Sequence, residues 1–141
     1  MAGPFTLALQ CFAEKAGARA DQAVREVVLE LGSRIVARSP VDTGRFRANW
    51  RLGLGSPVTG TTEATDPKGA ATVGSIASGV AQANASRIYY LTNNLPYAWR
   101  LETGWSKQAP LGMVGLTALE FVSIVDGVGA GLDSLGVVGR A

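Results

Sequence analysis

The sequence predicts a single small α+β domain, in which a long amino-terminal helix and further helices pack on a short, mainly antiparallel sheet. Three observations lead to this class: an apolar stripe of helical period before Pro40, a β-branched and aromatic run over residues 87–93, and no low-complexity linker that would divide residues 1–141 into two domains. With 47% hydrophobic and 17% charged residues, the chain is apolar enough to bury a core.

Three stretches have helical patterns. Residues 13–38 are predicted to form the longest helix, which Pro40 prevents from continuing. A second helix is predicted from Pro67 to about residue 85 with Asp66 as its cap, and a third over residues 111–125. The apolar stripe of the first helix comprises Ala20, Val24, Val27, Val28, Leu31 and Ile35.

A half-buried strand with a cationic outer face is predicted over residues 45–54, after a turn over residues 39–44. Strict alternation suggests it, because successive side chains of a strand point to opposite faces. The predicted inner face carries Phe46, Ala48, Trp50, Leu52 and Leu54, and the predicted outer face carries Arg45, Arg47, Asn49 and Arg51. Residues 58–65 suit a weaker strand or an exposed loop, and residues 97–103 a short helical turn that ends at Gly104.

Both ends of the chain are apolar. The leader over residues 1–12 is expected to pack on the domain body or on a neighbouring subunit. The glycine-rich tail over residues 127–141 contains Val128 and other apolar residues, whereas a free tail is normally polar. We therefore expect the tail to pack against another surface. The start of the chain does not resemble a signal peptide, and no run of about 20 apolar residues is present, so we expect no membrane partner and a protein that is made and used inside a cell.

The residue inventory argues against catalysis. Histidine is absent, and Cys11 is the only cysteine, which excludes Ser-His-Asp and Cys-His chemistry and an intramolecular disulfide. Asp42 and Glu102 are the carboxylates most suited to chemistry, but each lies beside a turn glycine, where capping the turn or pairing with Arg45 or Arg100 is the simpler role. We therefore expect no enzyme, no cofactor and no metal site.

Arginines and tryptophans suggest binding. The net charge is +2, yet arginines cluster over residues 34–51, where they form either a solvated face or a contact with nucleic acid or acidic protein. No RNP pattern, helix-turn-helix or zinc finger accompanies them. Trp50 is expected in the core, whereas Trp99 and Trp105 are expected to divide into one core residue and one interface anchor.

Two segments in this order resemble a known family. The first is Ser-Pro-Val-Asp-Thr-Gly-Arg-Phe-Arg-Ala-Asn-Trp over residues 39–50, and the second is Asn-Asn-Leu-Pro-Tyr-Ala-Trp-Arg-Leu-Glu-Thr-Gly-Trp-Ser-Lys-Gln-Ala-Pro-Leu-Gly-Met over residues 93–113. Together they resemble the neck or tail-completion proteins of long-tailed bacteriophages, including relatives of minor tail protein Z of lambda-like phages. The resemblance covers about residues 13–125.

The resemblance implies a non-enzymatic structural protein of the virion, located at the head–tail junction after assembly in the host cytoplasm. It implies a homo-oligomeric, hexameric ring through which genomic DNA passes, in contact with connector or neck proteins and with tail terminator or tail tube proteins. The alternative is a small basic nucleic-acid-binding adaptor. The interface residues that we expect are Asp42, Gly44, Arg45, Arg47, Arg51, Asn94, Tyr97, Trp99, Glu102, Gly104, Trp105, Gln108 and Pro110.

Three hypotheses follow for the interface. The two ends of the chain and residues 97–110 are expected to contact neighbouring subunits or adjoining rings. Truncation after Asp126 is expected to impair assembly while the domain stays folded. The arginine face is expected to meet protein carboxylates, because dense cations in a channel would retard moving DNA.

Overall fold

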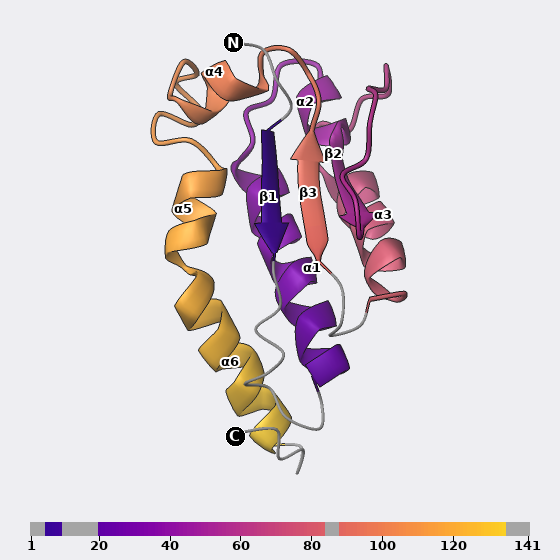
Figure 1. The fold of residues 1–141 in the computed structure, drawn as a ribbon. Coiled ribbons are helices and arrows are strands. Elements are labelled where there is room, and N and C mark those ends of the chain that lie inside the picture. The colour runs from indigo at the N-terminus through magenta and orange to yellow at the C-terminus, as the bar shows by residue number, and fades with distance from the viewer. Residues whose placement is uncertain (1–4, 10–19, 84–87, 135–141) are drawn as a thin grey trace.

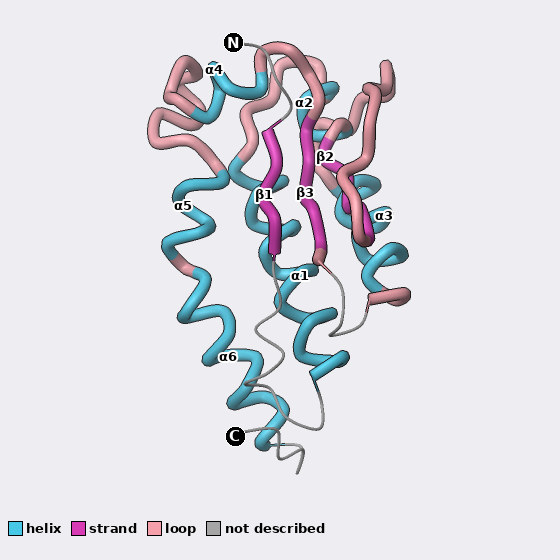
Figure 2. Tube along the Cα trace, viewed as in Figure 1, coloured by secondary structure: helices cyan, strands magenta, loops and turns pink. Residues whose placement is uncertain are grey.

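The computed structural model describes residues 5–9, 20–83 and 88–134, and these residues form an α+β fold (Figure 1, Figure 2). The strands are β1 (Phe5–Leu9), β2 (Trp50–Leu54) and β3 (Tyr89–Asn93). The helices are α1 (Ala20–Arg38), α2 (Arg45–Ala48), α3 (Ala70–Val80), α4 (Ala98–Glu102), α5 (Val114–Leu119) and α6 (Phe121–Ser134).

The three strands form one antiparallel sheet in the order β1-β3-β2. Asn93 at the end of the central strand lies opposite Phe5 on one side and Trp50 on the other. Residues 5–9 belong to the predicted leader, so this part of the leader packs on the domain body as an edge strand.

The core is built on α1, whose predicted apolar stripe is confirmed for every member with a described side chain. Val24, Val27, Val28, Leu31 and Ile35 are all buried. They pack in one cluster with Trp50 and the sheet residues Tyr89 and Leu91. Complete burial of a Val, Leu or Ile side chain contributes about 1.5–3 kcal/mol, so this stripe accounts for much of the stability of the domain. The predicted start of the helix, residues 13–19, lies outside the described residues.

Helix α1 lies between α3 on one side and the α5–α6 pair on the other (Figure 1). Both neighbours run opposite to α1. The carboxyl end of α3 lies near the start of α1, where Arg25 Nε donates to the carbonyl of Ala83 at 2.9 Å, whereas Arg38 at the end of α1 donates to Glu120 between α5 and α6 at 2.8 Å. Helices α3 and α5–α6 therefore run in the same direction on opposite sides of α1.

The prediction of one strand over residues 45–54 is wrong in its first half. Residues 45–48 form the helical turn α2, and only residues 50–54 form a strand. Gly44 adopts φ of 95° and starts the turn, and the Ala48 amide donates to the Gly44 carbonyl at 3.1 Å. Phe46 and Trp50 are four residues apart, so they share a face in a helical turn as well as in a strand. The sequence pattern therefore did not distinguish a helical turn from a strand at residues 45–48.

Helix α3 begins at Ala70, three residues later than predicted, and its N-cap residue is Gly69 rather than Asp66, although the Asp66 side chain still binds the first turn of the helix. The Asp66 carboxylate accepts hydrogen bonds from the backbone amide and the hydroxyl of Thr72, both at 2.7 Å. Burial raises the pKa of Asp66, but hydrogen bonds from Thr72, Ala71 and Gly69 outweigh burial and hold that pKa below its ordinary value. The predicted extent of the helix to about residue 85 is wrong, because α3 ends at Val80 and residues 81–83 are not helical.

The prediction of one helix over residues 111–125 is also wrong in its bounds. The helical region begins at Val114, a turn at Glu120 divides it into α5 and α6, and α6 continues to Ser134, beyond the predicted start of the tail at residue 127. Ile124 is buried, and Val125 and Val128 pack against the same core. Packing on α1 thus offsets the cost of the helical glycines, about 0.5–1 kcal/mol each. Truncation after Asp126 would cut this helix and remove Val128 from the core. The domain is therefore not expected to be left intact by this truncation.

The remaining predicted elements agree with the structure. Residues 89–93 are the central strand, residues 98–102 are the short helix α4, and Gly104 follows with φ of 92°. Residues 58–65 form a loop.

Candidate interface

The fold brings the two family-like segments, residues 39–50 and 93–113, into direct contact. The side-chain amide of Asn93 donates to the Phe46 carbonyl at 2.9 Å, and the rings of Phe46 and Tyr97 lie 6.0 Å apart. Gln108 pairs with Val41 through two hydrogen bonds of 2.8 Å each: its Oε1 accepts from the Val41 amide, and its Nε2 donates to the Val41 carbonyl. The two segments therefore form one structural unit.

Trp50 is a core residue, as predicted. Its side chain is buried, and its indole Nε1 donates to Ser39 Oγ at 2.8 Å. Its ring meets that of Phe46 edge-on at 5.9 Å. This packing fixes the start of the first segment against the sheet.

Glu102 caps helix α5 and does not pair with Arg100. Its Oε1 accepts hydrogen bonds from the backbone amides of Met113 at 3.0 Å and Val114 at 2.9 Å, and its Oε2 accepts from Gly115 at 2.9 Å. A carboxylate at the start of a helix satisfies amides that have no partner within the helix. This arrangement closes residues 102–115 into a fixed loop.

Two glycines permit this loop. Gly104 and Gly112 have φ of 92° and 82°, a region that side chains rarely adopt. A Cβ atom on Gly104 would lie 2.4 Å from the carbonyl oxygen of Pro110, and one on Gly112 would lie 2.3 Å from that of Glu102. Both close approaches require glycine.

Asn94 holds the long loop that follows β2. Its Nδ2 donates to the carbonyls of Val58 at 2.8 Å and Gly60 at 2.9 Å. Asn49 holds the same loop further along, since its side chain exchanges hydrogen bonds with both backbone groups of Thr62. Asn94 therefore has a structural role inside the domain.

The predicted cationic strand face does not exist. Arg45 donates to the carbonyl of Thr62 and forms an ion pair with Glu63, both at 3.0 Å. The three guanidinium nitrogens of Arg47 each donate to a carbonyl at 3.0 Å, those of Ala37, Ser39 and Pro67. Arg47 thereby caps the carboxyl end of α1.

Arg51 is the third member of the predicted cationic face, and it is half-buried on β2. Because Arg45 and Arg47 lie on α2 and bind within the domain, the three arginines do not form a row.

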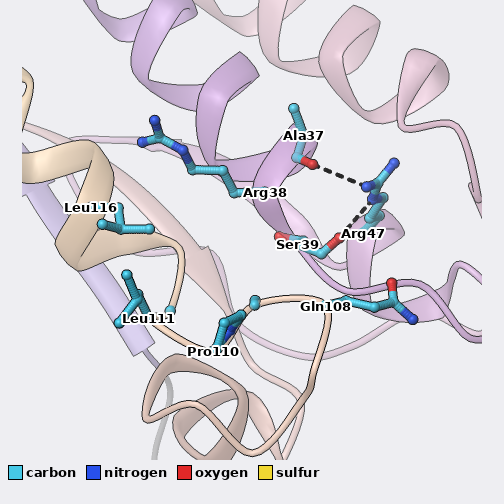
Figure 3. A pocket seen from close by; sticks show the side chains of 10 residues that line it. Ala37, Arg38, Ser39, Arg47, Gln108, Pro110, Leu111 and Leu116 are labelled. Carbon is cyan, nitrogen blue, oxygen red and sulfur yellow. Dashed lines mark hydrogen bonds between the residues drawn. The ribbon is translucent and has the colours of Figure 1, made fainter.

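A pocket of about 230 Å³ opens beside this cap (Figure 3). It lies between the end of α1 and residues 108–116, with Pro110, Leu111 and Leu116 on one side and Arg38 and Arg47 on the other. Arg38 already pairs with Glu120 at 2.8 Å, and Arg47 binds carbonyls. The charged groups of the pocket therefore have protein partners.

A second pocket, of about 220 Å³, lies between the two family-like segments. Asp42, Gly44 and Phe46 line it on one side, and Tyr97 and Gln108 on the other. Asp42 is exposed there, and a Cβ on Gly44 would lie 2.5 Å from the nitrogen of Pro67. The pocket brings Asp42 and Gly44 beside the second segment.

The exposed apolar side chains of residues 97–111 form the most distinctive surface of this unit. Trp99, Trp105 and Leu111 are 49%, 71% and 73% exposed, and Tyr97 is also exposed. The Arg100 guanidinium lies 4.9 Å from the centre of the Trp105 ring, a cation–π contact that orients the indole. The prediction that one of the two tryptophans lies in the core is wrong, because the short helix α4 and its loop place both at the surface.

Within the part of the chain that the structure describes, no group of three or more Cys, Asp and Glu residues suited to metal binding is found. Within the same residues, no helix is sufficiently long and apolar to span a membrane. The exposed groups that distinguish residues 97–111 are the apolar side chains of Tyr97, Trp99, Trp105 and Leu111.

Comparison of the chain with protein-family models, with curated protein sequences and with solved structures found no match.

The sequence patterns missed several residues that shape this surface. The helical pattern over residues 111–125 places either Leu119 or Glu120 on the face that it shares with Met113 and Ile124. In the structure Leu119 is 83% exposed, and Val122 is 69% exposed. Glu120 turns inward and accepts hydrogen bonds from Arg34 at 2.9 Å and from Arg38 at 2.8 Å. No local sequence signal marks this contact, because Arg34 and Arg38 lie far from Glu120 along the chain.

Proposed function

We propose that this protein is a structural component of the bacteriophage head–tail junction and acts as an oligomeric ring that joins the DNA-filled head to the tail. It works without catalysis, as a neck or tail-completion protein around the channel through which the genome passes. Its partners are copies of itself, connector or neck proteins, and tail terminator or tail tube proteins.

One observation carries the proposal: hydrogen bonds from side chains of the second family-like segment fix its shape, while its largest apolar side chains are exposed. Gln108 and Glu102 are used to shape the segment, whereas Trp99, Trp105 and Leu111 are exposed. Tryptophans on a preorganised surface are typical of binding hot spots, because little conformational entropy is lost when they are buried. A protein that functions alone gains nothing from this exposure.

The arrangement of the arginines disfavours the nucleic-acid-binding adaptor. Phosphate binding needs cations that are free to meet the backbone. Arg45 and Arg47 are bound within the domain, and Arg38 pairs with Glu120. The surface of residues 97–111 instead favours a protein partner.

Removal of this protein from the phage that encodes it tests the proposal. Electron microscopy should show filled heads and separately completed tails that are not joined. Normal infectious particles in the absence of the protein would overturn the proposal.

A paired substitution tests the surface itself. Trp99→Ala with Trp105→Ala should leave the domain folded, because both side chains are exposed, and should reduce the yield of joined particles by about tenfold or more. Lys107→Ala, in the same exposed loop, is the control and should join particles normally.

A further inference from the structure

A second exposed apolar surface lies on the outer side of α5 and α6, separate from the tryptophans. Leu119 and Val122 are 83% and 69% exposed and lie three residues apart. Glu120 forms a turn between the two helices, and its carbonyl accepts a hydrogen bond from the Ile124 amide at 2.9 Å, so α6 begins directly after α5. We call the exposed pair Leu119 and Val122 the α5–α6 ridge.

Helix α3 forms the opposite edge of the domain (Figure 1). Residues 70–80 contain no charged side chain, although an exposed helix face is normally charged or polar. Its exposed positions carry only small residues: Ala70, Ala71, Gly74, Ser75 and Ser78. A Cβ placed on Gly74 would meet no atom within 4 Å, so this face is flat and open.

The two surfaces lie at the same level along α1. A Cβ on Gly32 would lie 3.2 Å from the side chain of Ile76 in α3, and Arg34 binds Glu120 at 2.9 Å. Residues 74–76 and residues 119–122 therefore flank the same turns of α1, on opposite sides. The two outer helices also run in the same direction.

This placement is the one that a closed ring requires. A ring forms when one surface of each subunit meets a different surface of the next by rotation, and any shift along the axis would give a filament. Rotation about an axis parallel to these helices would bring the ridge of one copy onto α3 of the next, without inversion and without a shift. Bulky side chains against a flat face of small residues also permit close helix packing.

From these observations we infer that a second copy of this chain covers the α5–α6 ridge with its α3 helix, and that this contact closes the proposed ring. The inference rests on the proposed function and assigns its lateral contact. The occupant is a copy of the same chain because α3, on the opposite edge of the domain, offers a flat face of small residues at the level of the ridge, and α1 keeps the two surfaces apart within one molecule. The surface of Trp99, Trp105 and Leu111 then remains for an adjoining component.

A charge exchange tests the contact in the full chain. Gly74→Arg places a cation on α3 in open space, and Val122→Glu places an anion on the ridge. Each substitution alone should raise the concentration needed for self-association by about tenfold or more, because it buries an unpaired charge. Analytical ultracentrifugation measures this concentration, and circular dichroism checks that the variants stay folded.

The double variant, and an equimolar mixture of the two single variants, should recover association, since arginine and glutamate would then meet across the contact. Recovery in the mixture is specific to two different surfaces on neighbouring copies. Thr59→Arg, in the exposed loop after β2, is the control and should associate like the unmodified protein.

Unchanged association of both single variants would overturn the inference, as would a protein that stays monomeric at every concentration. These outcomes are distinct from failure of the proposed function, which depends on whether heads and tails join. Unjoined heads and tails in the absence of the protein, together with unaltered association of both variants, would reject this contact and leave the proposed function standing.

Discussion

The side-chain amide of Gln108 pairs with both backbone groups of Val41, as a neighbouring strand would, through two hydrogen bonds of 2.8 Å. Val41 belongs to the turn before α2, and Gln108 belongs to the exposed loop after α4. This one side chain therefore fixes the position of the tryptophan-bearing loop relative to the core.

Gln108→Glu should loosen that loop. The carboxylate still accepts from the Val41 amide but has no proton to donate to the Val41 carbonyl, which it would repel. Because the pair is exposed, we expect a loss of about 0.5–1.5 kcal/mol in the free energy of unfolding, measured in urea. Lys107→Gln, at the neighbouring exposed position, should change that free energy by less than about 0.5 kcal/mol. Equal stability of the two variants would contradict the role of the pair.

Arg47→Gln should destabilise the domain more than Arg51→Gln. Arg47 donates to three carbonyls and caps α1, so its loss leaves the carbonyls of Ala37 and Ser39 without this partner. The side chain of Arg51 makes no hydrogen bond or ion pair with any residue that the structure describes, although its backbone lies in the sheet. Hydrogen bonds from a charged donor contribute about 1.5–3 kcal/mol, and we expect the lower end of that range for this partly exposed site. Thermal unfolding measures the stability of both variants. An equal loss of stability in the two variants would contradict the capping role of Arg47.

Gly104→Ala should cost more stability than Gly55→Ala. The two glycines have similar φ, 92° and 84°, so alanine introduces the same backbone strain of about 1–2 kcal/mol at each. At Gly104 the new methyl would also lie 2.4 Å from the Pro110 carbonyl, whereas at Gly55 it meets no atom within 4 Å. The difference between the two variants in the free energy of unfolding therefore measures the cost of the contact between the new methyl group and the Pro110 carbonyl. Equal costs would show that the loop relaxes freely.

The ion cluster around Glu120 should make stability depend on pH. Hydrogen bonds from Arg38 and Arg34 lower the pKa of Glu120 from its ordinary 4.5 to about 2. A pKa that is lower in the folded state means that the contribution is complete above pH 4.5 and is lost as pH falls from 4.5 through 2. The difference in unfolding free energy between the unmodified protein and Glu120→Gln should shrink over that interval.

Glu26→Gln is the matched control for this titration. Glu26 is exposed on α1 and contacts no arginine among the described residues; Gln22 donates to it at 3.3 Å. Its substitution should change the free energy of unfolding by less than about 0.5 kcal/mol. A constant difference for Glu120→Gln would show that the cluster does not stabilise the ionised carboxylate.

Local patterns were sufficient to predict the fold class and most elements. The stripe from Val24 to Ile35 identified α1, and Gly104 marked the end of α4, because both signals lie within a few residues. The turn over residues 45–48 was missed because a spacing of four residues between Phe46 and Trp50 fits a helix and a strand equally well. The positive φ of Gly44 starts the helical turn at Arg45, and the sequence alone does not determine the value of φ that a glycine adopts.

The candidate site was less predictable. Aromatic and arginine content marked the right segments, but the roles of Gln108, Glu102 and Arg47 depend on contacts between residues far apart in the chain. The same holds for Leu119, whose exposure is set by how α5 and α6 pack on α1. Periodicity alone places such a residue within a helix but does not determine the side that faces the core.

Strand β1 has a kinetic consequence. Its residues lie near the start of the chain, yet their hydrogen-bonding partner is β3, where Phe5 lies opposite Asn93. During synthesis, the amino-terminal segment leaves the ribosome long before that partner exists. Pairing across so many residues is slow because a long loop must close first. The sheet should therefore be completed late, and a chaperone that holds the nascent amino terminus would delay this step selectively.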